Sequence, residues 1–260
     1  MHDVSLNVSL LYYSSYSPRF SPHLSDIKTI IFLMSVHYQN VVPWGRSFQE
    51  YVDMFSLNDE DLDKSILGCG DGPASFNCEM NRKGKSVVSV DPLYELDRET
   101  IQKRIDETYL EVLEQTRANQ DKFIWKNISS VEELGKIRMS SMSLFLDDFE
   151  KGKKQGRYVA GGLPELPLED ASFDLVLVSH LLFLYSEQLS YDFHVEAINE
   201  LLRVAGEVRI FPLVDLNSRK SIHLDEIIGE LVSQGYVVSE DKVEYEFQKG
   251  GNTMLKIQTI

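Results

Sequence analysis

Cysteine is scarce in this sequence: Cys69 and Cys78 are the only two among 260 residues. Their number and spacing fit neither a disulfide framework nor a zinc site, so we expect no metal. Low cysteine content is typical of a reducing compartment. No early basic cluster followed by a long apolar stretch, as in a secretory signal, is found near residue 1, and we therefore expect a cytoplasmic protein.

Positive charge and long apolar runs are also scarce. The sequence has 26 Lys and Arg residues and 41 Asp and Glu residues, which gives a formal net charge of −15. A phosphate backbone would meet a negative field, so we do not expect non-specific nucleic-acid binding. The apolar run from Ile30 to Met34 is far too short to cross a membrane, and no membrane partner is expected. Hydrophobic residues still make up 43% of the chain, an ordinary globular share.

The chain divides into two parts by its pattern. Residues 1–40 include a stretch rich in Ser, Pro and Tyr without a sustained period, and we expect a disordered or loosely packed extension there. Residues 41–260 alternate between expected strands and helices, which predicts an α/β three-layer sandwich with a mostly parallel seven-stranded sheet. A turn at Gly250 to Asn252 predicts an antiparallel C-terminal hairpin, with a strand reaching from Tyr236 to Phe247. Residues 96–157 predict a helical insertion between the second and third strands.

A glycine-rich turn lies between an expected strand at Ser65 to Leu67 and an expected helix at Ala74 to Arg82. Glycines there let the backbone approach a ligand closely, and the helix N-terminus offers its amides to an anionic group. Asp91 follows Gly72 by 19 residues at the end of the next expected strand, where an acid can accept hydrogen bonds from both ribose hydroxyls. Pro73 stands where the dinucleotide fingerprint has its last glycine. These residues indicate a nucleoside-bearing cofactor.

At these residues the chain resembles the class I S-adenosylmethionine-dependent methyltransferases. Leu67 to Gly72 resembles their first motif, and Val88 to Asp91 resembles their second. Leu166 to Val176 is similar to the run before their fourth strand. Ser179 to Leu182 is similar to the segment after that strand, which in the family lies at the methyl end of the cofactor. The resemblance covers about residues 60–260 in the family's order. It implies S-adenosylmethionine as cofactor and methyl transfer to an acceptor, with a small molecule favoured over a protein.

The resemblance also implies a set of cofactor contacts. Ile66 and Gly162 depart from it, because the family often has acids at both positions, and we expect adenine to rest on Leu163 and Pro92. Arg46 is expected to meet a carboxylate of the cofactor or of the substrate. The expected cofactor-binding residues are Gly68, Cys69, Gly70, Asp71, Gly72, Asp91, Pro92, Leu163, Ser179, His180 and Arg46.

Catalysis of methyl transfer needs alignment more than any one residue, so a general base is optional. His180 is the candidate catalytic residue, as a base, as a cofactor contact or as a packing residue. Two other functions stay open. Tyr245 and Lys249 have the spacing of a nicotinamide-dependent reductase pair, although they lie in the expected terminal hairpin. Ile66 and Gly162 also suit a non-catalytic binding module that regulates a partner.

Overall fold

The computed structural model describes residues 43–259, so the extension expected over residues 1–40 lies outside the described residues. Within residues 43–259 one seven-stranded sheet has the order β3-β2-β1-β4-β5-β7-β6. The strands are β1 (Ile66–Cys69), β2 (Val87–Val90), β3 (Tyr158–Val159), β4 (Phe173–Ser179), β5 (Ala205–Phe211), β6 (Val237–Lys242) and β7 (Thr253–Gln258). Strands β1 to β5 pair in parallel, whereas β7 is antiparallel to both β5 and β6. The predicted fold class is confirmed, including the C-terminal antiparallel hairpin.

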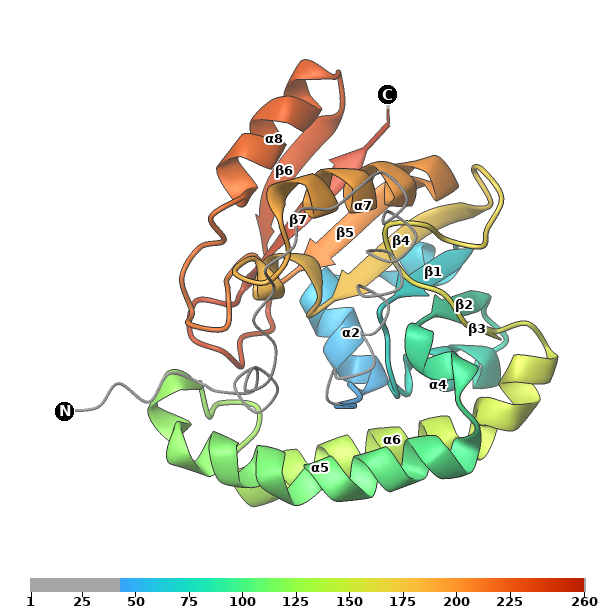
Figure 1. Ribbon diagram of the computed structural model, residues 1–260, viewed down its shortest axis with the longest axis vertical. Coiled ribbons are helices and arrows are strands. Elements are labelled where there is room, and N and C mark those ends of the chain that lie inside the picture. The colour runs from blue at the N-terminus through green and yellow to red at the C-terminus, as the bar shows by residue number, and fades with distance from the viewer. Residues whose placement is uncertain (1–42, 260) are drawn as a thin grey trace, which may run out of the picture. The chain divides into compact units, whose positions relative to one another are not determined.

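Helices cover both faces of this sheet. Figure 1 shows α7 and α8 on one side and α2, α4 and α6 on the other. The helices are α2 (Phe48–Phe55), α3 (Asp59–Leu62), α4 (Phe76–Arg82), α5 (Arg98–Ala118), α6 (Val131–Lys154), α7 (Tyr191–Val204) and α8 (Leu224–Ser233). None of the helices among residues 43–259 is long and apolar enough to cross a bilayer.

The central strand shows why this sequence forms a covered sheet. Residues 175–178 of β4 are all buried, because helices pack on both of its faces. On one face Leu175 and Leu177 join a core cluster with Phe55 of α2 and Phe76 of α4. Tyr51 of α2 stacks on Phe76, with ring centroids 4.6 Å apart. Helix α2 is therefore held over the end of β1, where the glycine-rich turn lies.

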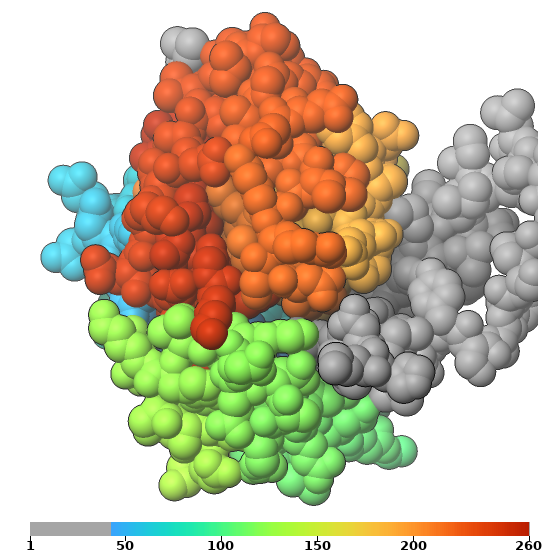
Figure 2. Space-filling view, turned by 90° about the vertical axis from the view of Figure 1, so that its left-hand side faces the viewer, coloured from blue at the N-terminus to red at the C-terminus, as the bar shows by residue number. Residues whose placement is uncertain are grey.

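The predicted insertion at residues 96–157 is confirmed as the helical pair α5 and α6, which we call the arm. Each helix begins at a residue whose side chain caps it, Asp97 and Ser130. The connection between the two helices reaches the loop at residues 243–252 between β6 and β7, and Figure 2 shows the two in contact. The amide of Ile124 donates to the carbonyl of Phe247 at 2.7 Å. The connection between α5 and α6 thus packs against the β6–β7 loop.

The same contact corrects one boundary. The strand expected from Tyr236 to Phe247 ends at Lys242, because the residues that follow leave the sheet and pack against the arm and the core. Phe247 stacks on Phe123 with ring centroids 4.7 Å apart, and Tyr245 is buried in the core. Aromatic residues favour strands, but here tertiary packing decides their conformation.

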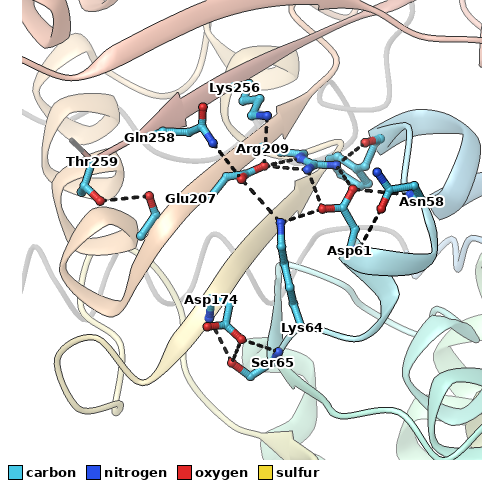
Figure 3. Close-up of polar contacts among 12 residues, drawn as sticks. Asn58, Asp61, Lys64, Ser65, Asp174, Glu207, Arg209, Lys256, Gln258 and Thr259 are labelled. Atoms are coloured by element: carbon cyan, nitrogen blue, oxygen red, sulfur yellow. Dashed lines mark hydrogen bonds and ion pairs between the residues drawn. The ribbon is translucent and has the colours of Figure 1, made fainter.

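A network of ion pairs fixes the segment before β1 to the sheet (Figure 3). Arg209 of β5 donates to both carboxylate oxygens of Asp61, at 2.9 and 3.0 Å. Arg209 also donates to Glu207 at 2.6 Å and to the carbonyl of Phe55 at 2.8 Å. Lys64 donates to Asp61 at 2.7 Å. These contacts join the end of α2 and all of α3 to β5, and so they help to position the N-terminal segment that enters the site.

Candidate functional site

The glycine-rich turn follows β1, which lies between β2 and β4 at the point where the strand order reverses. Gly70 and Gly72 have φ angles of +72° and +52°, a region that favours glycine. A Cβ on Gly70 would lie 2.8 Å from Cδ2 of Leu181, whereas a Cβ on Gly72 would meet nothing within 4 Å. Helix α4 begins at Phe76, two residues later than expected, so Pro73 and Ala74 belong to the turn. The turn therefore has bare backbone that a ligand can approach at Gly72.

Asp71, an expected cofactor contact, turns its side chain into the protein. Its carboxylate accepts hydrogen bonds from the Tyr51 hydroxyl at 2.7 Å and from the Ser89 hydroxyl at 2.6 Å. A Cβ on Gly68 would lie 1.9 Å from this carboxylate, so the glycine makes room for it. Burial raises the pKa of Asp71 to about 6. Only the backbone of Asp71 remains for a ligand, and the residue serves to hold the turn.

Asp91 ties the end of β2 to the turn. One carboxylate oxygen accepts the amide of Gly72 at 2.8 Å, and the other accepts the amide of Leu93 at 2.8 Å. Burial raises the pKa of Asp91 to about 6. Each oxygen keeps a second lone pair, so the carboxylate can still accept two hydroxyl groups from the cleft.

The residues expected at adenine come together beside Asp91. A Cβ on Gly162 would lie 3.0 Å from Cγ of Pro92, so the segment after β3 packs directly on the segment after β2. Leu163 is buried and Pro92 is partly exposed. Cys69 is buried in β1, and burial raises its pKa well above the ordinary value, so it presents no thiolate to the cleft. The apolar surface expected for a base is present at this end.

The segment after β4 lies beside the turn, since a Cβ on Gly70 would meet Leu181. The Ser179 hydroxyl lies 2.9 Å from Nδ1 of His180, and the amide of His180 donates to the carbonyl of Phe211 at 2.7 Å. His180 has a φ angle of +52°, which few non-glycine residues adopt. Burial lowers the pKa of His180 well below its ordinary value, and the positive charges of Arg46 and Arg138 lower it further. The imidazole is therefore neutral at neutral pH.

Arg46 reaches the cleft from the segment before α2. That segment lies on the turn, because the amide of Ser75 donates to the carbonyl of Arg46 at 3.0 Å. Nη1 of Arg46 donates to the carbonyl of Trp44 at 3.0 Å, while Nε is buried and has no hydrogen-bond partner among residues 43–259. Burial lowers the pKa of Arg46, and the charge of Arg138 acts in the same direction. No carboxylate among residues 43–259 forms an ion pair with this guanidinium within 4.0 Å.

Three residues meet near Arg46 in contacts that the sequence did not predict. Arg138 of α6 donates to one oxygen of Glu50 in α2, and the Tyr245 hydroxyl of the β6–β7 loop donates to the other at 3.0 Å. Burial alone would raise the pKa of Glu50, but Arg138 holds it at about 2. A capping box formed by Ser47 and Glu50 already explains Glu50 locally. No local signal marks Arg138, and the spacing of Tyr245 and Lys249 pointed to a different function.

The reductase pair is not assembled in the structure. The Tyr245 hydroxyl is buried against Glu50, whereas Lys249 is exposed and its amide donates to the carbonyl of Lys122 at 3.1 Å. Instead, Tyr245 joins the β6–β7 loop to α2, and Lys249 joins it to the connection between α5 and α6.

Known methyltransferases are among the solved structures that are similar to this chain, and no family model matches it. A magnesium protoporphyrin IX methyltransferase from Synechocystis PCC 6803 with bound S-adenosylmethionine is 12% identical, with 93% of this chain and 87% of that chain covered and a TM-score of 0.42. The 1,6-didemethyltoxoflavin-N1-methyltransferase of Burkholderia thailandensis is 13% identical, with coverage of 95% and 94% and a TM-score of 0.45. Because both TM-scores lie below 0.5, we base the function on the strand order and the geometry of the cleft.

Among curated proteins, one from Methanocaldococcus jannaschii shows a much higher identity. The uncharacterized protein MJ0045 is 37% identical over 225 residues, which cover 86% of this chain and 98% of that protein. The match therefore extends over nearly the whole relative and includes most of the sheet and its helices. The chain belongs to the same family as MJ0045 of Methanocaldococcus jannaschii.

Proposed function

We propose that the chain is an S-adenosylmethionine-dependent methyltransferase. The observation that carries the proposal is the pair formed by the glycine-rich turn after β1 and Asp91 after β2, joined by the hydrogen bond from Gly72. The turn lies at the switch point of a sheet whose strand order and antiparallel hairpin agree with the resemblance in the sequence. A nucleoside with a charged tail suits this combination of bare backbone and carboxylate.

The residues of the cleft fit the parts of this cofactor in order. The backbone of residues 68–72 lies where the methionine part would pass, and the Asp91 carboxylate has free lone pairs for the ribose hydroxyls. Pro92 and Leu163 would flank the adenine, and Ser179 and His180 would lie at the methyl end. When bound, the cofactor supplies an electrophilic methyl group on a sulfonium. The protein's part is to align the acceptor with that methyl group and to exclude water.

We also propose that the acceptor is a small molecule. The arm and the β6–β7 loop meet through backbone hydrogen bonds and stacked aromatic rings, and they bring Arg138 and Tyr245 into the site from that side. A site that is built in part from such packed segments suits a small acceptor better than a folded protein or a nucleic-acid duplex.

Isothermal titration tests the cofactor assignment. We expect the purified protein to bind S-adenosylhomocysteine and S-adenosylmethionine and not NADH. Binding of NADH alone would favour the reductase instead. Binding of both adenosyl compounds without methyl transfer to any acceptor in a broad panel of small molecules would favour a non-catalytic binding module.

A further inference from the structure

Arg46 carries a partly buried charge that the described protein leaves unpaired. Its one hydrogen bond goes to the neutral carbonyl of Trp44, and its Nε has no partner. Glu50 is too far for an ion pair, and both of its oxygens already accept from Arg138 and Tyr245. Leaving a cation without a partner in a poorly hydrated place is unfavourable. An anionic ligand group would satisfy the guanidinium.

Two further polar side chains, those of His180 and Tyr185, lie within electrostatic range of Arg46. The charge of Arg46 lowers the pKa of His180 and opposes the effect of burial on the pKa of Tyr185. Nδ1 of His180 lies 2.9 Å from the Ser179 hydroxyl, and Nε2 forms no hydrogen bond to residues 43–259. The Tyr185 hydroxyl makes no hydrogen bond within residues 43–259, and both side chains are partly exposed. Arg46 therefore lies close enough to His180 and Tyr185 to act on both electrostatically.

Among residues 43–259, the titratable side chains near Arg46 are poorly suited to take a proton from an acceptor, and burial raises the pKa of Tyr185, which keeps its hydroxyl protonated. Glu50 is held by Arg138, and Asp71 lies beneath the turn in hydrogen bonds to Tyr51 and Ser89. Asp91 is at the ribose end of the cleft. A proton on His180 would meet two positive charges, those of Arg46 and Arg138. An acceptor that arrives already ionised needs no such base.

Resting on the methyltransferase function above, we propose that the acceptor is a small carboxylic acid whose carboxylate pairs with Arg46 and becomes a methyl ester. A carboxylate oxygen forms the new bond to the methyl carbon while the bond from that carbon to sulfur breaks, and its electron pair stays on sulfur. The negative carboxylate and the positive sulfonium become a neutral ester and a neutral thioether, and no proton moves. The planar guanidinium orients the carboxylate through paired hydrogen bonds.

Binding tests the anion site apart from activity. The protein saturated with S-adenosylhomocysteine is titrated with benzoate and with benzamide, which have the same shape and differ in charge. We expect benzoate to bind at least about tenfold more tightly than benzamide, and Arg46→Gln to remove this difference. Arg117→Gln is the matched control, because Arg117 lies on the arm in an exposed ion pair with Glu132. Equal binding of benzoate and benzamide to the unaltered protein would overturn the proposal.

Label transfer tests the product. The protein is given S-adenosylmethionine with a labelled methyl group and a panel of small carboxylic acids. We expect label that mild alkali releases as methanol, and a value of kcat/KM that changes little between about pH 7.5 and 9, above the titration of Asp91, because no base takes a proton from the acceptor. Label that is stable to alkali, or no transfer to any acid, would overturn the acceptor class.

A third measurement separates the two sources of a carboxylate, since the cofactor also has one. Binding of S-adenosylhomocysteine is compared with that of 5′-methylthioadenosine, which lacks the amino-acid part. If Arg46→Gln weakens only the former and leaves benzoate binding unchanged, Arg46 binds the cofactor and the proposal is wrong. If the unaltered protein binds neither adenosyl compound, the methyltransferase function itself fails, whatever benzoate does.

Discussion

Asp91→Asn tests the cofactor assignment most directly, because it changes one oxygen of the ribose acceptor into a donor. In the structure the two carboxylate oxygens accept the amides of Gly72 and Leu93. Asparagine keeps one of these hydrogen bonds and turns an NH2 group toward the other amide. The variant therefore loses a charged acceptor for the ribose and leaves one backbone donor unsatisfied.

Two magnitudes follow from this geometry. Loss of a hydrogen bond to a charged group costs about 1.5–3 kcal/mol, so the affinity for S-adenosylhomocysteine should fall roughly ten- to hundredfold. The unsatisfied amide costs about 1–3 kcal/mol of stability, which corresponds to a decrease in Tm of roughly 2–10 °C for a chain of this size. The control is Asp97→Asn at the N-cap of α5, where asparagine caps as well as aspartate.

The pH dependence gives a second measurement on the same residue. Burial raises the pKa of Asp91 to about 6, so the carboxylate is protonated and its acceptor capacity is lost as the pH falls through 6. Titration calorimetry should therefore show weaker binding to the unaltered protein at pH 5 than at pH 7.5, and a smaller change for Asp91→Asn. Unchanged affinity in the folded variant, or the same decrease with pH in both proteins, would refute the role of Asp91.

Three further changes have expected outcomes. Burial raises the folded-state pKa of Asp71 from 3.8 to about 6, so the protonated side chain stabilises the fold fully below pH 3.8 and this stabilisation is lost as the pH rises through 6. An asparagine side chain does not titrate. The Tm of Asp71→Asn minus the Tm of the unaltered protein should therefore increase from pH 4 to pH 7. Asp61→Asn breaks a buried pair with Arg209 and should lower the free energy of unfolding in urea by about 3–5 kcal/mol. Gly70→Ala should weaken S-adenosylhomocysteine binding more than Gly84→Ala. The two glycines have nearly equal φ angles, but only a Cβ on Gly70 would meet a neighbouring side chain. Titration calorimetry measures the two affinities.

The framework of the site could be predicted from the sequence because its signals are local. The apolar run of β4, the glycine-rich turn and the acid at the end of β2 each occupy a few consecutive residues. The sheet places Gly68 beside Ser89 of β2 and Leu177 of β4, and parallel pairing brings the carboxyl ends of these strands to one edge. The order of the strands and of the segments that follow them was therefore enough to predict that the turn, Asp91 and His180 lie at the same edge of the sheet.

The charged part of the site could not be predicted because its contacts are far apart in the sequence. Arg138 and Glu50 are 88 positions apart, and Tyr245 and Glu50 are 195 apart. Each has a local explanation that hides its role. Glu50 completes a capping box, Arg138 lies in a helix rich in charged residues, and Tyr245 lies in a segment that reads as a strand.

The direction of Asp71 is a smaller case of the same kind. A glycine-rich turn indicates that backbone faces a ligand, but it does not say where the one large side chain of the turn points. That direction depends on Tyr51 of α2 and Ser89 of β2, which both donate to the carboxylate. The turn is held from below by these two hydroxyls and from the side by Asp91.

His180 now has a narrower set of roles than its position alone allowed. Its backbone bends at φ +52° to place the ring past β4, and Ser179 occupies Nδ1. A base must gain a proton during the reaction, and here the new charge would lie near Arg46 and Arg138. The same two arginines that disfavour a charged imidazole favour an ionised acceptor. These two charges support our proposal that Arg46 stabilises an ionised acceptor and that His180 is a neutral contact at the methyl end.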